Sequence, residues 1–418
     1  MIEFQFTVDD TGTVTGIVTS PSAEAPDLPI NGVISDGAVT IKIPAVEAVF
    51  EGEVDGATMT GTWYQSGAEV PAVFELRDEP LTLARPQEPT PPFPYEATDV
   101  RFPNGDISLA GTLVVPEGEG PFPAVVLSSG SGPQDRDETI VGHKPFLVLS
   151  DAFALAGIAS LRFDDRGVGG STGDPVGATT ADLARDTASA VQFLADDDRF
   201  DSIGIVGHSE GGIIGPMVAH DSEAVDSVVL LAGPGLPGLD VLLRQTEDLM
   251  RVEGASEAGI AWQLSWRREI MEVSASSVPK DEAAEAIRAI VSAALENPPA
   301  GVTETLDPSM TEQFVAAFTD PWMRFFLAYD PAPALEDLGI PTLALIGSLD
   351  VQVSAEENIP ALEAALEANA DATVFELEGL NHLFQNAETG AVSEYARIEE
   401  TFSPEAIDLI TAWILEQS

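Results

Sequence analysis

Two stretches of the sequence contain the pattern Gly-x-Ser-x-Gly, one centred on Ser209 in GHSEG and the other on Ser171 in GGSTG. A serine hydroxyl is a weak nucleophile in water and becomes reactive when a base lies within hydrogen-bond reach. The serine must also protrude, which a tight turn from a strand into a helix achieves if small residues flank it. The pattern therefore predicts a nucleophile only where a strand precedes it and a helix follows it.

The surroundings of Ser209 meet this condition, whereas those of Ser171 do not. The run SIGIV before Ser209 is typical of a buried strand, and GGIIGPMVAH after it is compatible with a helix whose first turn is rich in glycine. The flanks of Ser171, DDRGVGG and TGDPVGATT, have no periodic pattern and indicate a loop. We predict that Ser209 is the nucleophile and that the match at Ser171 reflects the abundance of glycine.

The elements around Ser209 alternate between strand and helix patterns from about residue 97 onward. Apolar runs such as AVVLSS, IASLRFD and SVVLLAG alternate with helical patterns such as TTADLARDTASAVQFLADD. This alternation predicts an α/β fold with a mostly parallel sheet and helices on both faces. Over about 237–330 helical patterns follow one another without a strand between them, so we expect a helical insertion there, after which PTLALIGSLD resumes the alternation.

The segment from about 97 to 418 resembles an α/β-hydrolase, with GHSEG at the position of the family's nucleophile elbow. In that family the nucleophile, the acid and the base follow in the order Ser, Asp or Glu, His. The resemblance implies that Asp350, just after the strand-like TLALIG, is the acid, since the competing Asp330 precedes that strand. It implies that His382, after the strand-like ATVFELEG, is the base.

The chain has only four histidines, and the same resemblance argues against the other three as the base. His143 and His220 stand at the wrong points in the family's order. His208 adjoins the nucleophile, and we expect its side chain to point elsewhere.

An oxyanion hole needs backbone N–H groups aimed at the oxygen that becomes negative during the reaction. One is expected from Glu210, directly after the nucleophile, and the other from the loop SSGSGPQDRDE at 128–138. Many relatives carry His-Gly where this chain has Ser129-Gly130. We select Ser131 as the second donor, with Gly132 as the alternative.

The following loop, DDRGVGGS at 164–171, resembles one that such hydrolases carry near the site. We expect a structural role for it, in which Asp164 and Arg166 hold neighbouring loops in place. The helical insertion would form a cap that supplies the acyl or alcohol pocket. Its aromatic residues could equally well only pack the cap against the core; they are Trp262, Trp266, Trp322, Phe325 and Phe326.

Three stretches, SGSGPQDRDE, PWMRFFLAYDP and GLNHLFQ, make the chain similar to a narrower bacterial group of serine esterases with a small β-domain in front. Relatives in that group often carry export signals. The resemblance therefore implies an extracytoplasmic or secreted protein whose signal has been removed, with a cytoplasmic location as the alternative.

These features together predict a serine carboxylesterase that hydrolyses esters of short to medium acyl chains and needs no cofactor or metal. An aspartate at the elbow would have indicated a dehalogenase, so Ser209 favours acyl transfer. A peptidase or a thioesterase would use the same three residues. A non-catalytic α/β-hydrolase scaffold that acts as a binding module is the alternative from another class. The sequence leaves the natural substrate and the oligomeric state open.

Residues 1–78 have the pattern of short strands with tight turns, and we expect them to form a small all-β domain for packing or attachment. Asp36-Gly37 and Asp55-Gly56 lie between strand-like runs, and Asp-Gly suits a two-residue hairpin turn. Residues 79–96 are rich in proline, which removes backbone donors and favours extended chain, so they indicate a linker to a catalytic domain at 97–418.

The composition excludes several classes of partner. Asp and Glu total 70 against 18 Lys and Arg, for a formal net charge of −52, which repels phosphate backbones and argues against nucleic acid. No apolar run is long enough to span a membrane. The chain contains no cysteine, so it can form neither disulfides nor thiolate nucleophiles. The acids are spread along the chain, which favours a solvated surface like that of salt-adapted proteins, with a generally acidic bacterial protein as the alternative.

Overall fold

The computed structural model describes residues 2–19, 27–65, 68–77, 84–299, 302 and 310–418. The chain divides into two compact units, Met1–Arg85 with Ile140–His143, and Pro86–Thr139 with Lys144–Ser418. The break after Arg85 falls within the segment 79–96 that we expect to be a linker, of which residues 79–83 lie outside the described residues.

The smaller unit contains a seven-stranded sheet in which each strand pairs antiparallel with the next one along the chain. This confirms the all-β fold expected for the N-terminal segment. The strands are β1 (Glu3–Val8), β2 (Thr13–Thr19), β3 (Leu28–Ser35), β4 (Ala38–Ile43), β5 (Ala48–Asp55), β6 (Thr58–Gln65) and β7 (Ala68–Glu75), with a 3-10 helix η1 (Pro44–Val46) between β4 and β5.

Two hairpin turns test the Asp-Gly prediction. Asp36 and Gly37 connect β3 to β4, and both have positive φ, 50° and 85°, as that turn requires. The second turn was placed wrongly by one residue. Asp55 pairs with Thr58, so the loop consists of residues 56 and 57, and Gly56 supplies the positive φ of 59° at its first position. Because glycine tolerates positive φ, Gly56 can occupy the first position of that turn.

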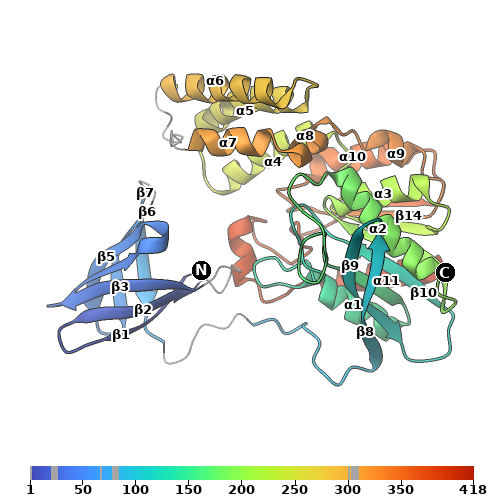
Figure 1. Cartoon of the computed structure of the whole chain (residues 1–418), viewed down its shortest axis with the longest axis horizontal. Coiled ribbons are helices and arrows are strands. Elements are labelled where there is room, and N and C mark those ends of the chain that lie inside the picture. Colours follow the sequence, from blue (N-terminus) through green and yellow to red (C-terminus); the bar gives the residue numbers. More distant parts are fainter. Residues whose placement is uncertain (1, 20–26, 66–67, 78–83, 300–301, 303–309) are drawn as a thin grey trace. The chain divides into compact units, whose positions relative to one another are not determined.

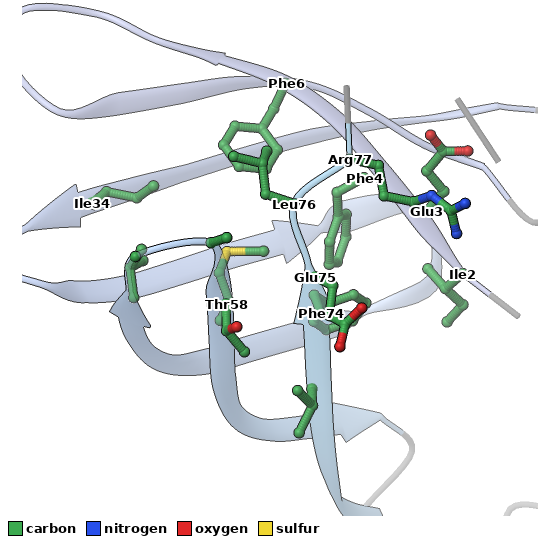
Figure 2. Close-up of a pocket in the computed structure, with 15 residues that line it drawn as sticks. Ile2, Glu3, Phe4, Phe6, Ile34, Thr58, Phe74, Glu75, Leu76 and Arg77 are labelled. Carbon is green, nitrogen blue, oxygen red and sulfur yellow. The ribbon is translucent and has the colours of Figure 1, made fainter. Parts of the chain in front are cut away.

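The sheet of the smaller unit buries an apolar core that includes Ile41, Ile43 and Phe50. A pocket of about 510 Å³ adjoins it, with Phe4 and Phe74 among its lining residues (Figure 2). The described lining includes neither serine nor histidine.

The larger unit is built on an eight-stranded sheet with the order β15-β14-β13-β12-β10-β11-β9-β8. Strands β10 to β15 run parallel, whereas β9 is antiparallel to β8 and β11. The mostly parallel sheet that the alternation predicted is thus confirmed. The strands are β8 (Tyr95–Asn104), β9 (Ile107–Pro116), β10 (Phe122–Ser128), β11 (Ala159–Phe163), β12 (Phe200–His208), β13 (Ser227–Leu231), β14 (Thr342–Gly347) and β15 (Ala372–Leu377).

Helices cover both faces of this sheet (Figure 1). Helices α1 (Pro145–Ala156) and α11 (Pro404–Glu416) pack on one face in an apolar cluster with Leu127 and Val206. Helices α2 (Thr180–Ala195), α3 (Gly211–Asp221) and α10 (Ala355–Ala365) pack on the other face with Val126 and Ile205. Neighbouring residues of one strand serve opposite faces because side chains alternate along a strand. Near the C-terminus a 3-10 helix η3 (Val392–Arg397) precedes α11.

Helices also fill the stretch between β13 and β14, where we expected an insertion (Figure 1). They form an apolar cluster of their own that includes Trp266, Ile270 and Ile287. The helices are α4 (Gly238–Val252), α5 (Glu257–Ala275), α6 (Lys280–Glu296), α7 (Thr311–Phe318) and α8 (Pro321–Ala328), and the short α9 (Ala332–Glu336) then leads into β14. Across the described part of the chain, no helix is both long and apolar enough to cross a membrane.

Candidate active site

Parallel strands carry the candidate residues to one edge of the sheet. Ser209 follows β12, Asp350 comes shortly after β14, and His382 comes shortly after β15. The expected oxyanion loop follows β10, which pairs directly with β12. The carboxyl ends of parallel strands meet at the same edge, which is where open α/β sheets place their sites.

Ser209 occupies a strained turn between β12 and α3. Its φ is 53°, in the left-handed region that residues other than glycine rarely adopt. A side chain at Gly207 would place its Cβ 2.0 Å from the carbonyl oxygen of Gly211, and one at Gly211 would lie 2.1 Å from that of Ser128. Only glycine fits at both positions. The turn therefore has the strand-to-helix context that the sequence indicated.

The structure brings His382 and Asp350 together. His382 Nδ1 lies 2.8 Å from Asp350 Oδ2, and both side chains are buried. Asp350 Oδ1 accepts the backbone N–H groups of Gln352 and Val353, each at 2.8 Å. Both oxygens of the carboxylate are thus occupied, which fixes its orientation toward the imidazole.

The imidazole of His382 lies beside the elbow. Its ring centre is 4.8 Å from that of His208, the residue directly before Ser209. Within the described residues, neither Ser209 Oγ nor His382 Nε2 makes a hydrogen bond. Hydrogen bonds between a nucleophile and its base are often long in a ligand-free enzyme and tighten once substrate is bound.

His208 has a role that the sequence did not reveal. Its Nδ1 lies 2.8 Å from Glu138 Oε1, and its Nε2 lies 2.9 Å from the carbonyl oxygen of His382. Both partners are acceptors, so both ring nitrogens donate. Burial lowers the pKa of His208, but the charge of Glu138 and the hydrogen bonds from the ring outweigh it, and the net effect is a raised pKa. The raised pKa favours the protonated form of His208, whose ring contacts the backbone of the candidate base.

Glu138 and Asp165 hold the loop that follows β10. Glu138 Oε1 accepts the backbone N–H of Gly130 at 2.6 Å. Asp165 accepts the backbone N–H of Gln134 at 2.9 Å and the hydroxyl of Ser129 at 3.2 Å. Neither carboxylate was selected from the sequence, because a loop acid in so acidic a chain carries no distinguishing local signal.

The same loop packs against the elbow. A Cβ at Gly130 would lie 3.1 Å from Ser209 Cβ, so the main chain of the loop passes close to the serine. The N–H of Gly130 is already bonded to Glu138. In the described residues, the N–H groups of Ser131, Gly132 and Glu210 donate to no protein acceptor.

Ser171, the second serine with the pattern, is buried in a loop. Its hydroxyl donates to the carbonyl oxygen of Asp164 at 2.7 Å and accepts the N–H of Ala110 at 2.9 Å. Both contacts are to backbone, so the hydroxyl serves to join this loop to β9. The structure gives Ser171 no histidine partner within the described residues.

Asp164 and Arg166 hold loops, as expected. Asp164 accepts the N–H of Gly170 and pairs with Arg136 at 2.8 Å. Arg166 Nε donates to Asp186 on α2 at 2.7 Å. Neither side chain contacts Ser209 or His382 in these pairings.

The aromatic residues of the helical insertion separate into two groups. Trp262, Trp266 and Phe326 are buried, and the two tryptophans belong to the insertion's own apolar cluster. Trp322 and Phe325 are half-buried. Trp322 Nε1 donates to Glu210 Oε1 at 2.8 Å, so this tryptophan reaches the residue that follows Ser209.

In the chain as described, no three His, Asp or Glu side chains are grouped to hold a metal ion.

The chain is similar to known proteins over most of its length. Residues 125–394 match the alpha/beta hydrolase family, and that range includes Ser209, Asp350 and His382. The chain is 28% identical to the esterase EstD of Thermotoga maritima over 328 residues, which cover 78% of this chain and 69% of EstD.

Solved structures with lower sequence identity also align with the chain. The esterase Pf2001 of Pyrococcus furiosus is 14% identical with a TM-score of 0.47, covering 77% of this chain and 91% of that one. Est1E from Butyrivibrio proteoclasticus is 13% identical with a TM-score of 0.44, covering 76% of this chain and 98% of that one.

Proposed function

Because the chain belongs to the alpha/beta hydrolase family, we propose that it is a serine carboxylesterase that hydrolyses esters of short to medium acyl chains. Its similarity to the esterase EstD supports ester hydrolysis. The observation that carries the proposal is the buried pair of His382 and Asp350, 2.8 Å apart, beside an elbow that holds Ser209 with left-handed backbone. The substrate is a small-molecule ester, and the proposed reaction uses no cofactor or metal.

In the first half of the reaction, Ser209 Oγ attacks the acyl carbon while His382 Nε2 takes the hydroxyl proton. The carbonyl oxygen becomes negative and accepts the N–H groups of Glu210 and Ser131, with Gly132 as the alternative to Ser131. The carbon–oxygen bond to the alcohol then breaks, and His382 gives its proton to the departing oxygen. Asp350 accepts a hydrogen bond from the Nδ1–H group of His382, which stabilises the imidazolium without transfer of that proton.

In the second half, a water molecule attacks the acyl-enzyme, and His382 takes one of its protons. The ester bond to Ser209 breaks, the proton returns to Ser209 Oγ, and the carboxylic acid leaves. The free N–H groups in the loop after β10 support this scheme, because Gly130 is already bonded to Glu138 whereas Ser131 is not.

The proposal extends to the division of the chain. Residues 1–78 would be a β-domain for packing or attachment, 79–96 a linker, and 97–418 the catalytic domain. The helices of about 237–330 would act as a cap that lines the substrate pocket.

The deciding experiment compares the wild-type protein with Ser209→Ala. We expect p-nitrophenyl esters to be hydrolysed by the wild type, with kcat lowered by about 10⁴-fold or more in the variant, because the three residues act as a unit. A fluorophosphonate should label the wild type and not the variant. Faster turnover of aminoacyl amides or thioesters than of esters would replace the esterase proposal with a peptidase or a thioesterase. Absence of labelling and turnover would indicate a non-catalytic scaffold.

A further inference from the structure

A pocket of about 400 Å³ lies between the loop after β10 and helix α8. This volume is within the range of roughly 300–1,000 Å³ that small-molecule sites occupy. The exposed surface of its lining is mostly apolar and includes Ser131 and Gly132 of the loop, Ala178 before α2, Leu183 on α2, and Trp322 on α8. Three charged residues, Asp165, Arg166 and Asp320, also line it. The pocket therefore adjoins the residues proposed to bind the carbonyl oxygen.

The chemistry of the proposed reaction decides which part of an ester fits there. His382 must reach the leaving oxygen to protonate it, so the alcohol part has to lie beside the loops of His382 and Asp350. No described residue of those loops lines this pocket, whereas two residues of the oxyanion loop do. We propose that this pocket binds the acyl chain and that Glu210 is a positioning residue that fixes Trp322 as its wall. The inference rests on the proposed function.

Glu210 connects the elbow to two helices through a single carboxylate oxygen. Its Oε1 accepts the indole N–H of Trp322 at 2.8 Å and the hydroxyl of Thr180, at the start of α2, at 2.6 Å. The side chain of Glu210 is buried, which strengthens both bonds because water does not compete for them. The Trp322 ring also stacks on Phe326, with centres 5.4 Å apart and planes 22° apart. The hydrogen bond thus holds the edge of the Trp322 ring, and the stacking on Phe326 holds its face.

The pocket is tested by changing its volume. The readout is the ratio of kcat/KM for p-nitrophenyl octanoate to that for p-nitrophenyl acetate, because the two esters share their alcohol. Ala178→Phe narrows the pocket and should lower this ratio by at least about tenfold, because each methylene group that no longer fits lowers kcat/KM by about tenfold or more. Leu183→Ala widens it and should raise the ratio. A matched control, Ala328→Phe, puts the same side chain at an exposed position of α8 and should leave the ratio unchanged.

A second series varies the alcohol at constant acyl length, comparing ethyl and octyl acetate. Ala178→Phe should not change the preference within that series. If it changes the alcohol preference instead, or if both folded pocket variants keep the wild-type acyl ratio, the inference is overturned. A wild type that hydrolyses no ester at all would overturn the proposed function itself, which is a separate outcome.

The role of Glu210 is tested by removing either the donor or the acceptor of its hydrogen bond with Trp322. Trp322→Phe keeps an aromatic wall but deletes the indole N–H, and Glu210→Ala deletes the acceptor. Both should weaken the acyl-length preference, with the loss appearing mainly as a higher KM for the octanoate. Glu210→Gln keeps an acceptor oxygen and should recover the preference relative to Glu210→Ala. Equal preferences in Glu210→Ala and Glu210→Gln would exclude the positioning role.

Discussion

The buried imidazole of His208 donates a hydrogen bond of 2.8 Å to the carboxylate of Glu138. The same oxygen of Glu138 accepts the N–H of Gly130, and the other nitrogen of His208 donates to the carbonyl oxygen of His382. One ion pair therefore joins the loop proposed to form the oxyanion hole to the loop that carries the proposed base. His208 directly precedes Ser209, so this pair also connects both loops to the elbow.

The first prediction concerns this pair. Glu138→Gln removes the charge that raises the pKa of His208 and should loosen both loops. We expect kcat to fall by about tenfold to a hundredfold with little change in KM, less than the roughly 10²–10³-fold cost of deleting an oxyanion donor outright. Steady-state kinetics on p-nitrophenyl butyrate measure it. Glu312→Gln, at an exposed glutamate of α7, is the control. An unchanged kcat in folded Glu138→Gln would show that the pair does not position the site.

The second prediction separates Ser171 from Ser209. Ser171→Ala leaves the N–H of Ala110 without its acceptor in a buried position. The free energy of unfolding should fall by about 1–3 kcal/mol, whereas kcat for ester hydrolysis should stay within about twofold, since the hydroxyl bonds only to backbone. Urea unfolding and initial rates on the same preparation check both statements. Loss of activity in a stable Ser171→Ala would contradict the assignment of Ser209.

The third prediction concerns the pH dependence of stability. Burial raises the pKa of Asp165 from 3.8 to about 7, against hydrogen bonds from Gln134 and Ser129 and with the charges of Glu210 and Asp186 adding to it. Between these two values the folded protein keeps the proton and the unfolded chain does not. Binding of this proton stabilises the folded protein by up to roughly 4 kcal/mol below pH ~4. The stabilisation is lost as the pH rises to ~7.

Asp165→Asn lacks this titration. The wild type should lose stability between about pH 5 and about pH 8, whereas Asp165→Asn should not. The free energy of unfolding of Asp165→Asn minus that of the wild type should therefore rise over this range, as measured by urea titrations in high salt. Asp106→Asn changes an exposed aspartate and should show no such trend. A difference between Asp165→Asn and the wild type that is the same at both pH values would mean that Asp165 titrates normally in the folded protein.

The fourth prediction follows from the net charge of −52. Exposed carboxylates repel one another over a Debye length, which is ~30 Å at ~0.01 M salt and ~3 Å at ~1 M. Raising NaCl across this range should raise the melting temperature at neutral pH, whereas kcat on a neutral ester should change much less. A melting temperature that is constant or falls with salt would mean that the acids are already compensated, and the interpretation as salt adaptation would have to be dropped.

The sequence by itself determined the elements and the position of the elbow. Buried strands such as SIGIV and the apolar face of α2 carry their periodicity in neighbouring residues, so a local pattern is enough to identify them. Ser209 was separated from Ser171 in the same way, by the strand before it and the helix after it. The turn at Gly56 was misplaced by one residue because the pairing of Asp55 with Thr58 depends on the strand register, which the dipeptide does not encode.

Apart from His382 and Asp350, which the resemblance already named as base and acid, only the tertiary structure decided which buried polar side chains meet. His208 and Glu138 are 70 residues apart in the sequence, and Glu210 and Trp322 are 112 apart. A periodic pattern records which face of an element is apolar, and it contains nothing about the partner of a buried charge. Those partners are set by how the sheet order brings β10 beside β12 and by how α8 packs near the elbow. Burial then makes each such contact specific, because an unpaired charge inside the protein costs far more than one on the surface.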